Sequence, residues 1–203
     1  AVFPFSCKNS KVSYDLGLGV IERGNNTDNL YEVPAQKWAD ITDESNHFGV
    51  SVFSDCKYGW DKPNDNTLRL TCLHTPAGAF TKETRQDMQD LGRNIFSFGI
   101  YCHNGGFENG TQTQNENFQK PLIAFQTTAR RKGCLSDDFS FADMNTDDVL
   151  IRAVKNEEDG TGIIIRVNEA VGTSHKKVKL SLFEEILSAE EALADESIIG
   201  SAK

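Results

Sequence analysis

Hydrophobic and polar positions alternate in short runs along the first half of this chain, which is the pattern of β-strands with one buried face. Residues 49–53 (GVSVF) and 67–74 (TLRLTCLH) show this alternation. Residues 11–23 (KVSYDLGLGVIER) also predict a strand, which Gly17 and Gly19 interrupt with a bulge or a close approach of another backbone. The first half therefore predicts a sheet of short strands.

Three other segments of the first half are less regular. Residues 31–41 (YEVPAQKWADI) contain Pro34, which lacks the N–H that a central strand needs, so we expect an edge strand or an irregular segment. Residues 77–92 lack strand periodicity and favour a short helix or a loop. The polar stretch 104–117, rich in Gly, Asn, Thr and Gln, predicts a long loop.

Residues 93–103 (RNIFSFGIYCH) predict a strand with two chemically different faces. Because successive side chains point to opposite faces, Tyr101 and His103 are expected on one side. The opposite side is expected to carry Phe96, Phe98, Ile100 and Cys102.

The second half repeats the β pattern in five runs separated by turns such as EEDGTG and AVGTSH. These runs are residues 121–127, 139–144, 148–155, 161–169 and 175–183. Short runs joined by tight turns, without helices of βαβ length between them, favour an antiparallel meander. Only residues 187–196 (LSAEEALADE) have a helix-favouring composition.

These elements predict an all-β fold: one large antiparallel β-sandwich domain over residues 1–203, with few short helices. A chain of 203 residues with 38% hydrophobic residues is long enough to bury a core of that size. The chain begins at Ala1 rather than at a methionine, which leaves open that it is a piece of a longer protein.

The charge balance disfavours two classes of binding partner. Thirty acidic residues against 21 basic ones give a net charge of −9, which disfavours nucleic acids and anionic lipid surfaces. No apolar run approaches the ~20 residues of a membrane-spanning helix. Five cysteines without a CxxC spacing indicate reduced thiols, so we expect a cytoplasmic location.

Most catalytic motifs are absent: the chain has no GxSxG, no P-loop and no HExxH. Cys72 and His74 share a strand face, but two such residues on a packed strand are more typical of a core than of a metal site. Neighbouring carboxylates, such as Asp137 with Asp138, lie in turns, where solvation and local hydrogen bonding explain them.

The stretch 55–60 (DCKYGW) is the strongest candidate for binding, because it gathers polar and aromatic groups at a strand end. Asp40 and Asp55 are flanked by the aromatic residues Trp38, Tyr58 and Trp60. Aromatic faces beside carboxylates suit sugars, although the corner of a β-sandwich uses the same residue types.

The order of the motifs resembles the C-terminal β-domain of glycoside hydrolase family 38, the α-mannosidases. The resemblance covers nearly the whole chain and rests on an ordered set of segments. These are YDLGLGVIER, YEVPAQKWADI, FGVSVFSDCKYGW, LRLTCLHTP, DLGRNIFSFGIYCH, PLIAFQT and VLIRAVKNEEDGTGIIIRVNEAVG.

The resemblance implies a galactose mutarotase-like β-sandwich in a zinc-dependent retaining α-mannosidase. In that family the catalytic carboxylates and the zinc ligands lie in a separate N-terminal domain. We therefore expect no catalytic residue, metal or other cofactor in this chain, and we expect it to stop before the family's last strands. Departures from the family pattern occur at Gly24–Asn26, His74 and Asn94, and they put the substrate preference in question.

The resemblance thus implies a non-catalytic domain that supports its own N-terminal catalytic domain, which acts on mannose-containing glycans. Arg23, Asp55, Lys57 and Tyr58 are the residues that we expect at the rim of the active site. Two alternatives stay open. One is a free carbohydrate-binding module that stacks sugars on Trp38, Tyr58 and Trp60; the other is a structural domain that self-associates into a homo-oligomer.

Overall fold

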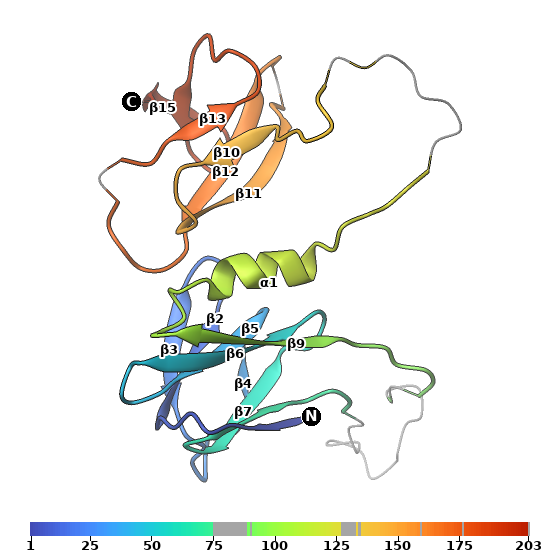
Figure 1. The fold of residues 1–203 in the computed structure, drawn as a ribbon, viewed down its shortest axis with the longest axis vertical. Coiled ribbons are helices and arrows are strands. Elements are labelled where there is room, and N and C mark those ends of the chain that lie inside the picture. Colours follow the sequence, from blue (N-terminus) through green and yellow to red (C-terminus); the bar gives the residue numbers. More distant parts are fainter. Residues whose placement is uncertain are drawn as a thin grey trace. The chain divides into compact units, whose positions relative to one another are not determined.

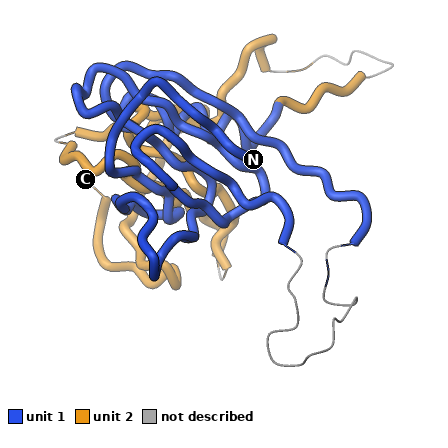
Figure 2. Tube along the Cα trace, turned by 90° about the horizontal axis from the view of Figure 1, so that it is seen from below, with its two compact units in different colours: residues 1–121 blue, residues 122–203 orange. Residues whose placement is uncertain are grey.

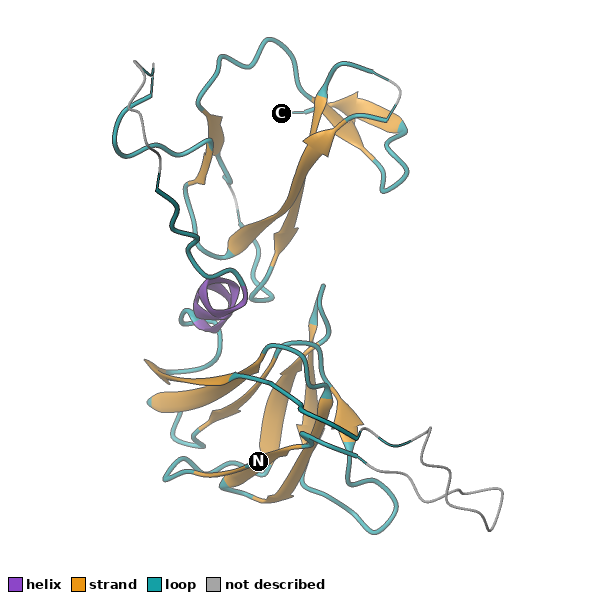
Figure 3. Cartoon of the chain, turned by 90° about the vertical axis from the view of Figure 1, so that its right-hand side faces the viewer, coloured by secondary structure: helices purple, strands orange, loops and turns teal. Residues whose placement is uncertain are grey.

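The computed structural model describes residues 1–74, 89, 91–126, 133, 135–158, 160–175 and 177–202. These residues form fifteen β-strands and one short helix, so the predicted all-β class with antiparallel pairing is confirmed (Figures 1 and 3). The chain divides into two compact units, Ala1–Pro121 and Leu122–Lys203, which Figure 2 distinguishes by colour. A single domain over residues 1–203 stays a prediction.

The first unit contains a five-stranded antiparallel sheet in the order β3-β2-β5-β6-β9 (Figure 1). Its strands are β2 (Lys11–Asp15), β3 (Val20–Gly24), β5 (Trp38–Thr42), β6 (Phe48–Ser54) and β9 (Phe98–Asn104). The predicted strand at 49–53 is therefore confirmed as β6. Gly49–Ser54 is buried along its whole length, because both faces of this strand are covered.

A second, four-stranded sheet in the order β1-β8-β7-β4 completes the sandwich of the first unit. Its strands are β1 (Val2–Pro4), β4 (Val33–Pro34), β7 (Gly59–Asn64) and β8 (Thr67–Leu70). Buried side chains from both sheets form one hydrophobic cluster. Its members are Phe3, Cys7, Val12, Tyr14, Ala35, Ala39, Ile41, Val50, Val52, Trp60, Leu68 and Leu70.

Two strand predictions in the first unit need correction. Residues 11–23 form two strands rather than one with a bulge, because the chain turns back at Gly17, which has a positive φ of 89°. Leu16 N donates to Gly19 O at 2.8 Å and closes this turn. Residues 38–42 form the central strand β5, whereas Pro34 lies on β4 at the edge of its sheet, as expected.

Helix α1 (Thr111–Gln119) occupies the stretch that the sequence predicts as a loop, so that prediction was wrong. The helix packs on the outer face of β6 and β9 (Figure 1). Thr111 and Asn115 are fully buried although they are polar. A helix that buries polar side chains shows no apolar 3.6-residue period, which is the signal by which helices are recognised.

The alternation along β9 is confirmed, and the more polar face is the buried one. His103 is 8% exposed, whereas Phe98 and Ile100 are 46% and 55% exposed. β9 is the outermost strand of its sheet, and its apolar face meets the opposite sheet through the ring of Phe3, 5.1 Å from that of Phe98. The helix expected within residues 77–92 falls largely outside the described residues.

The second unit contains three antiparallel pairs: β10–β13, β11–β12 and β14–β15. The strands are β10 (Ala142–Met144), β11 (Val149–Asn156), β12 (Ile163–Glu169), β13 (Leu180–Leu182), β14 (Glu190–Ala192) and β15 (Ile198–Ser201). The hairpin of β11 and β12 is confirmed, but β10 pairs with the distant β13 instead of its neighbour β11.

Two further predictions in the second unit were wrong. Residues 121–126 form no strand, and the rest of that predicted strand lies outside the described residues. The predicted helix at 187–196 is instead β14 followed by a turn, because pairing with β15 outweighs a weak intrinsic propensity. No helix among the described residues is long and apolar enough to span a membrane.

Candidate functional site

The connection between β6 and β7 holds three of the four predicted rim residues, and it is fixed against the segment that leads into β9. Asp55 N donates to Ser97 O at 3.2 Å, and Ser97 N donates to Asp55 Oδ2 at 2.9 Å. The Lys57 ammonium lies 5.5 Å from the centre of the Phe96 ring, within cation–π range. Asp55 and Lys57 are therefore held in defined positions at the surface.

The Asp55 carboxyl is kept ionised by its neighbours. Desolvation raises its pKa, but the hydrogen bonds from the Cys56 thiol and from Ser97 together outweigh this effect, so the pKa of Asp55 lies below the usual value. A carboxyl with a lowered pKa is a poor general acid, since that role needs a proton retained near neutral pH. Asp55 is suited to accepting hydrogen bonds from a ligand.

Arg23, the fourth predicted residue, and Tyr58 meet the backbone at residues 34 and 35. Arg23 Nη1 donates to Pro34 O at 2.8 Å, and its guanidinium lies 5.2 Å from the centre of the Tyr14 ring. Ala35 N donates to Tyr58 O at 3.0 Å, and the Tyr58 side chain is 55% exposed. Three of the four residues thus lie on the β6–β7 connection, and Arg23 of β3 reaches Pro34, next to the residue that bonds Tyr58.

The stacking platform proposed from Trp38, Tyr58 and Trp60 cannot form. Trp38 and Trp60 are both 0% exposed, and they lie in different sheets. Trp60 belongs to the hydrophobic cluster between the sheets, whereas the Trp38 ring packs 5.5 Å from the ring of Phe107. Aromatic spacing in the sequence could not reveal that both indoles are core residues.

A buried polar cluster lies beneath helix α1 and was not predicted as a unit. His103 Nε2 and Ser51 Oγ both bond Asp40 Oδ2, at 2.6 and 2.7 Å. Thr42 Oγ1 donates to Asp40 Oδ1 at 2.8 Å, and Ser51 Oγ lies 2.7 Å from Thr111 Oγ1. Strand β5 supplies Asp40 and Thr42, β6 supplies Ser51 and β9 supplies His103, and Asp40 pairs with Ser51 in the register of the sheet.

The cluster contains Asp, His and Ser, but its geometry differs from that of a hydrolytic triad. In a triad the serine bonds one imidazole nitrogen and the carboxylate bonds the other. Here His103 Nε2 faces both Asp40 and Ser51, while Nδ1 lies 3.2 Å from Gly105 O. The side chains of Asp40 and His103 are 0% and 1% exposed, so the pair is closed off from solvent. The contact of Ser51 with Thr111 joins the cluster to helix α1.

The charge state of His103 follows from its contact with Asp40. Burial disfavours the imidazolium, but the hydrogen bond and the charge of Asp40 outweigh that penalty, so the pKa of His103 is raised. The imidazole also needs space that only glycine leaves. A Cβ on Gly49 would lie 2.3 Å from His103 Cε1.

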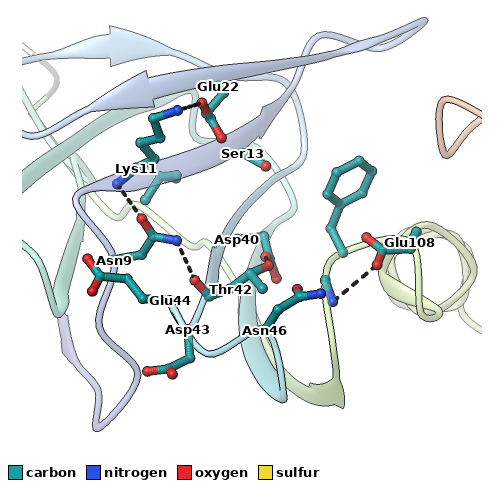
Figure 4. A pocket seen from close by; sticks show the side chains of 13 residues that line it. Asn9, Lys11, Ser13, Glu22, Asp40, Thr42, Asp43, Glu44, Asn46 and Glu108 are labelled. Atoms are coloured by element: carbon teal, nitrogen blue, oxygen red, sulfur yellow. Dashed lines mark hydrogen bonds and ion pairs between the residues drawn. The ribbon is translucent and has the colours of Figure 1, made fainter.

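A polar cleft of about 280 Å³ opens beside Asp40 (Figure 4). Asn9 joins two of its walls, because Asn9 Nδ2 donates to Thr42 O at 2.8 Å and Lys11 N donates to Asn9 Oδ1 at 3.0 Å. Lys11 is paired with Glu22 at 2.6 Å. The cleft is acidic and lined by the carboxylates of Glu22, Asp40, Asp43, Glu44 and Glu108.

These carboxylates do not form a metal site. Within the described ranges, no group of three or more His, Cys, Asp or Glu side chains is arranged to hold a metal ion. Asp43 is occupied by hydrogen bonds from the Ser45 hydroxyl at 2.6 Å and Lys8 N at 3.0 Å, which lower its pKa. The cleft offers acceptors for the hydroxyl groups of a ligand.

Comparison with known proteins adds a family match. Residues 1–78 match the family described as "Glycosyl hydrolases family 38 C-terminal domain". Alpha-mannosidase G of Dictyostelium discoideum is 27% identical over 173 residues, which are 79% of this chain and 14% of that protein. An alpha-mannosidase of Saccharomyces cerevisiae is 24% identical over 84% of this chain and 16% of its own length. The chain therefore spans about one seventh of these relatives.

Two solved structures from Enterococcus faecalis share the fold. A protein in glycosyl hydrolase family 38 superimposes with a TM-score of 0.79 at 19% identity, covering 100% of this chain and 25% of its own. An alpha-mannosidase superimposes with a TM-score of 0.75 at 21% identity, covering 89% of this chain and 21% of its own. The β-fold thus recurs as a minor part of larger chains.

Proposed function

We propose that this chain, a C-terminal domain of glycosyl hydrolase family 38, is the non-catalytic β-domain of an α-mannosidase. The observation that carries the proposal is the family match over residues 1–78, joined by similarity to two proteins named alpha-mannosidase. Because the chain spans only 14% and 16% of those relatives, most of their length remains for a catalytic domain.

In this proposal the longer protein hydrolyses α-mannosides with retention of configuration and carries zinc in its catalytic domain. The described residues of this chain do not fit a zinc site, since none of their His, Cys, Asp and Glu side chains form a suitable group. We therefore assign the metal and the catalytic carboxylates to the catalytic domain. In this proposal the β-domain supports that domain. We also propose a cytoplasmic location for the longer protein, because the five cysteines of this chain have no CxxC spacing.

The rim role is proposed for Arg23, Asp55, Lys57 and Tyr58. Two features support it: Tyr58 presents an exposed aromatic ring, and Asp55 presents an ionised carboxylate that the backbone holds in place. An aromatic face and a fixed acceptor are the two groups that a sugar ring needs for stacking and hydroxyl recognition. Sugar recognition by these residues would affect binding more than the chemical step.

Single substitutions in the full-length protein test the rim role. Tyr58→Phe and Asp55→Asn remove one hydrogen-bonding group each, and we expect a higher KM for a mannoside at nearly constant kcat. Asp138→Asn serves as the control, since Asp138 is exposed and lies in the second unit. Unchanged kcat and KM with a lower melting temperature would assign Tyr58 and Asp55 to structure alone.

A further inference from the structure

Two Asn–Gly pairs, Asn104–Gly105 and Asn109–Gly110, lie between the end of β9 and the start of α1. An asparagine that precedes glycine can react with its own backbone. The amide nitrogen of the glycine attacks the side-chain carbonyl carbon of the asparagine, and the glycine has no Cβ to hinder the attack. Both asparagines are exposed, so the contacts of each pair, rather than access to water, decide which of them reacts.

The sheet protects the first pair. Asn104 is the last residue of β9 and pairs with Phe48 of β6, so its backbone is held extended. The nitrogen that would attack, Gly105 N, donates its hydrogen to His47 O at 3.0 Å. The attack would break this hydrogen bond and bend the end of the strand away from its partner. The fold therefore slows the reaction at Asn104.

The second pair lacks both restraints. Asn109 lies in the turn before α1, and Gly110 N donates no hydrogen bond among the residues that the structure describes. The Asn109 side chain donates from Nδ2 to Glu108 Oε1 at 3.3 Å and to Gly106 O at 3.4 Å. Both distances are longer than is usual for N–H···O hydrogen bonds. These weak contacts let the side chain turn toward Gly110 N.

Tyr101 activates the nitrogen of Gly110. The Tyr101 hydroxyl donates to Asn109 O at 3.2 Å, and Asn109 O is the carbonyl oxygen of the peptide bond that contains Gly110 N. When this nitrogen loses its proton, the negative charge is shared with that oxygen, where the hydroxyl stabilises it. The Tyr101 ring stacks 6.3 Å from the ring of Phe53. The donor is thus in place before the reaction begins.

From these contacts we propose that Asn109 deamidates spontaneously, that Tyr101 promotes the reaction, and that the isoaspartate product loosens helix α1. Gly110 N bonds to Asn109 Cγ and loses its proton to water, while the Cγ–Nδ2 bond breaks and the nitrogen leaves as ammonia with a proton from water. This step forms a cyclic imide. A water molecule then opens the imide at one of its two carbonyl carbons, which gives either aspartate or isoaspartate.

The two products differ in their effect on α1. Aspartate changes only the charge, and its repulsion from Glu108 is opposed by its attraction to the positive N-terminal end of the helix. Isoaspartate adds a methylene group to the main chain two residues before Thr111, whose hydroxyl contacts Ser51 in the buried cluster. We therefore expect the isoaspartate form to unfold at a lower urea concentration than the unreacted chain.

Peptide mapping by mass spectrometry, after incubation of the folded chain near pH 8, tests the site. We expect Asn109 to deamidate about tenfold faster than Asn104, because only the attack on Asn104 breaks a backbone hydrogen bond. In the chain unfolded in guanidinium chloride, the two pairs should react at similar rates. Equal rates in the folded chain, or the same preference for Asn109 in the unfolded chain, would overturn the proposal.

One variant and one control test the role of Tyr101. Tyr101→Phe removes the hydroxyl and keeps the ring, so deamidation at Asn109 should slow about tenfold in the folded chain and be unchanged in the unfolded chain. Tyr31→Phe is the control, since Tyr31 is exposed and precedes β4. Undiminished deamidation of folded Tyr101→Phe, or an unchanged urea midpoint of the isoaspartate form, would also overturn the proposal.

Discussion

The buried pair of Asp40 and His103 makes a quantitative prediction about stability. Asp40→Asn removes the negative charge but keeps the size of the side chain. Breaking a buried ion pair on one side costs about 3–5 kcal/mol, because the remaining charge is left without compensation. With the side chains of both partners at most 1% exposed and Nε2 2.6 Å from Oδ2, we expect a loss in that range near pH 6.

The loss should depend on pH in a defined direction. The folded-state pKa of His103 lies above its unfolded value of about 6.5. The stabilisation from the charged pair is therefore complete below pH ~6.5 and is lost as the pH rises through the folded-state pKa. Asp40→Asn should consequently cost more near pH 6 than near pH 9.

Urea unfolding of the chain at both pH values measures this effect. With a slope of about 2 kcal/mol per M, a loss of ~3–5 kcal/mol lowers the midpoint by about 1.5–2.5 M. Glu22→Gln is the matched control, since its pair with Lys11 is more than half exposed and should contribute less than ~1 kcal/mol. A loss equal to that control, or one that is the same at both pH values, would refute the reasoning.

Two other substitutions test the packing of the first unit. Gly49→Ala should cost about 1–3 kcal/mol in urea unfolding, because its Cβ would lie 2.3 Å from His103 Cε1; an unchanged midpoint would show that the imidazole moves freely. Leu68→Ala should cost about 2–5 kcal/mol, since Leu68 is 0% exposed, whereas Leu122→Ala at a fully exposed position should change stability by less than ~0.5 kcal/mol; equal effects would contradict the assigned core.

Strands with one apolar face were predictable from the sequence, because burial imposes a two-residue period on them. β8 shows this directly: Leu68 and Leu70 are buried, and Arg69 between them is exposed. Helix α1 was not predictable by the same rule. Its buried residues Thr111 and Asn115 meet a sheet face that is itself polar, so no hydrophobic period marks the helix.

The candidate site was only partly visible in the sequence. Asp40 stood out because of its aromatic neighbours, but its contacts with Ser51 and His103 depend on the register of three strands. Lys62 gave no signal at all, since a lysine in a turn-rich segment normally lies in solvent. Lys62 is nevertheless 1% exposed, and Asn26 of the loop between β3 and β4 bonds its backbone, a contact that no local pattern predicts.

In the function proposed above, this chain supports the catalysis of a longer α-mannosidase without performing it. The most direct measurement is hydrolysis of an aryl α-mannoside by the purified, folded chain beside the full-length protein. We expect release of the aryl group by the full-length protein and none above the buffer rate by the chain alone. Hydrolysis by the chain that persists after treatment with a metal chelator would contradict it.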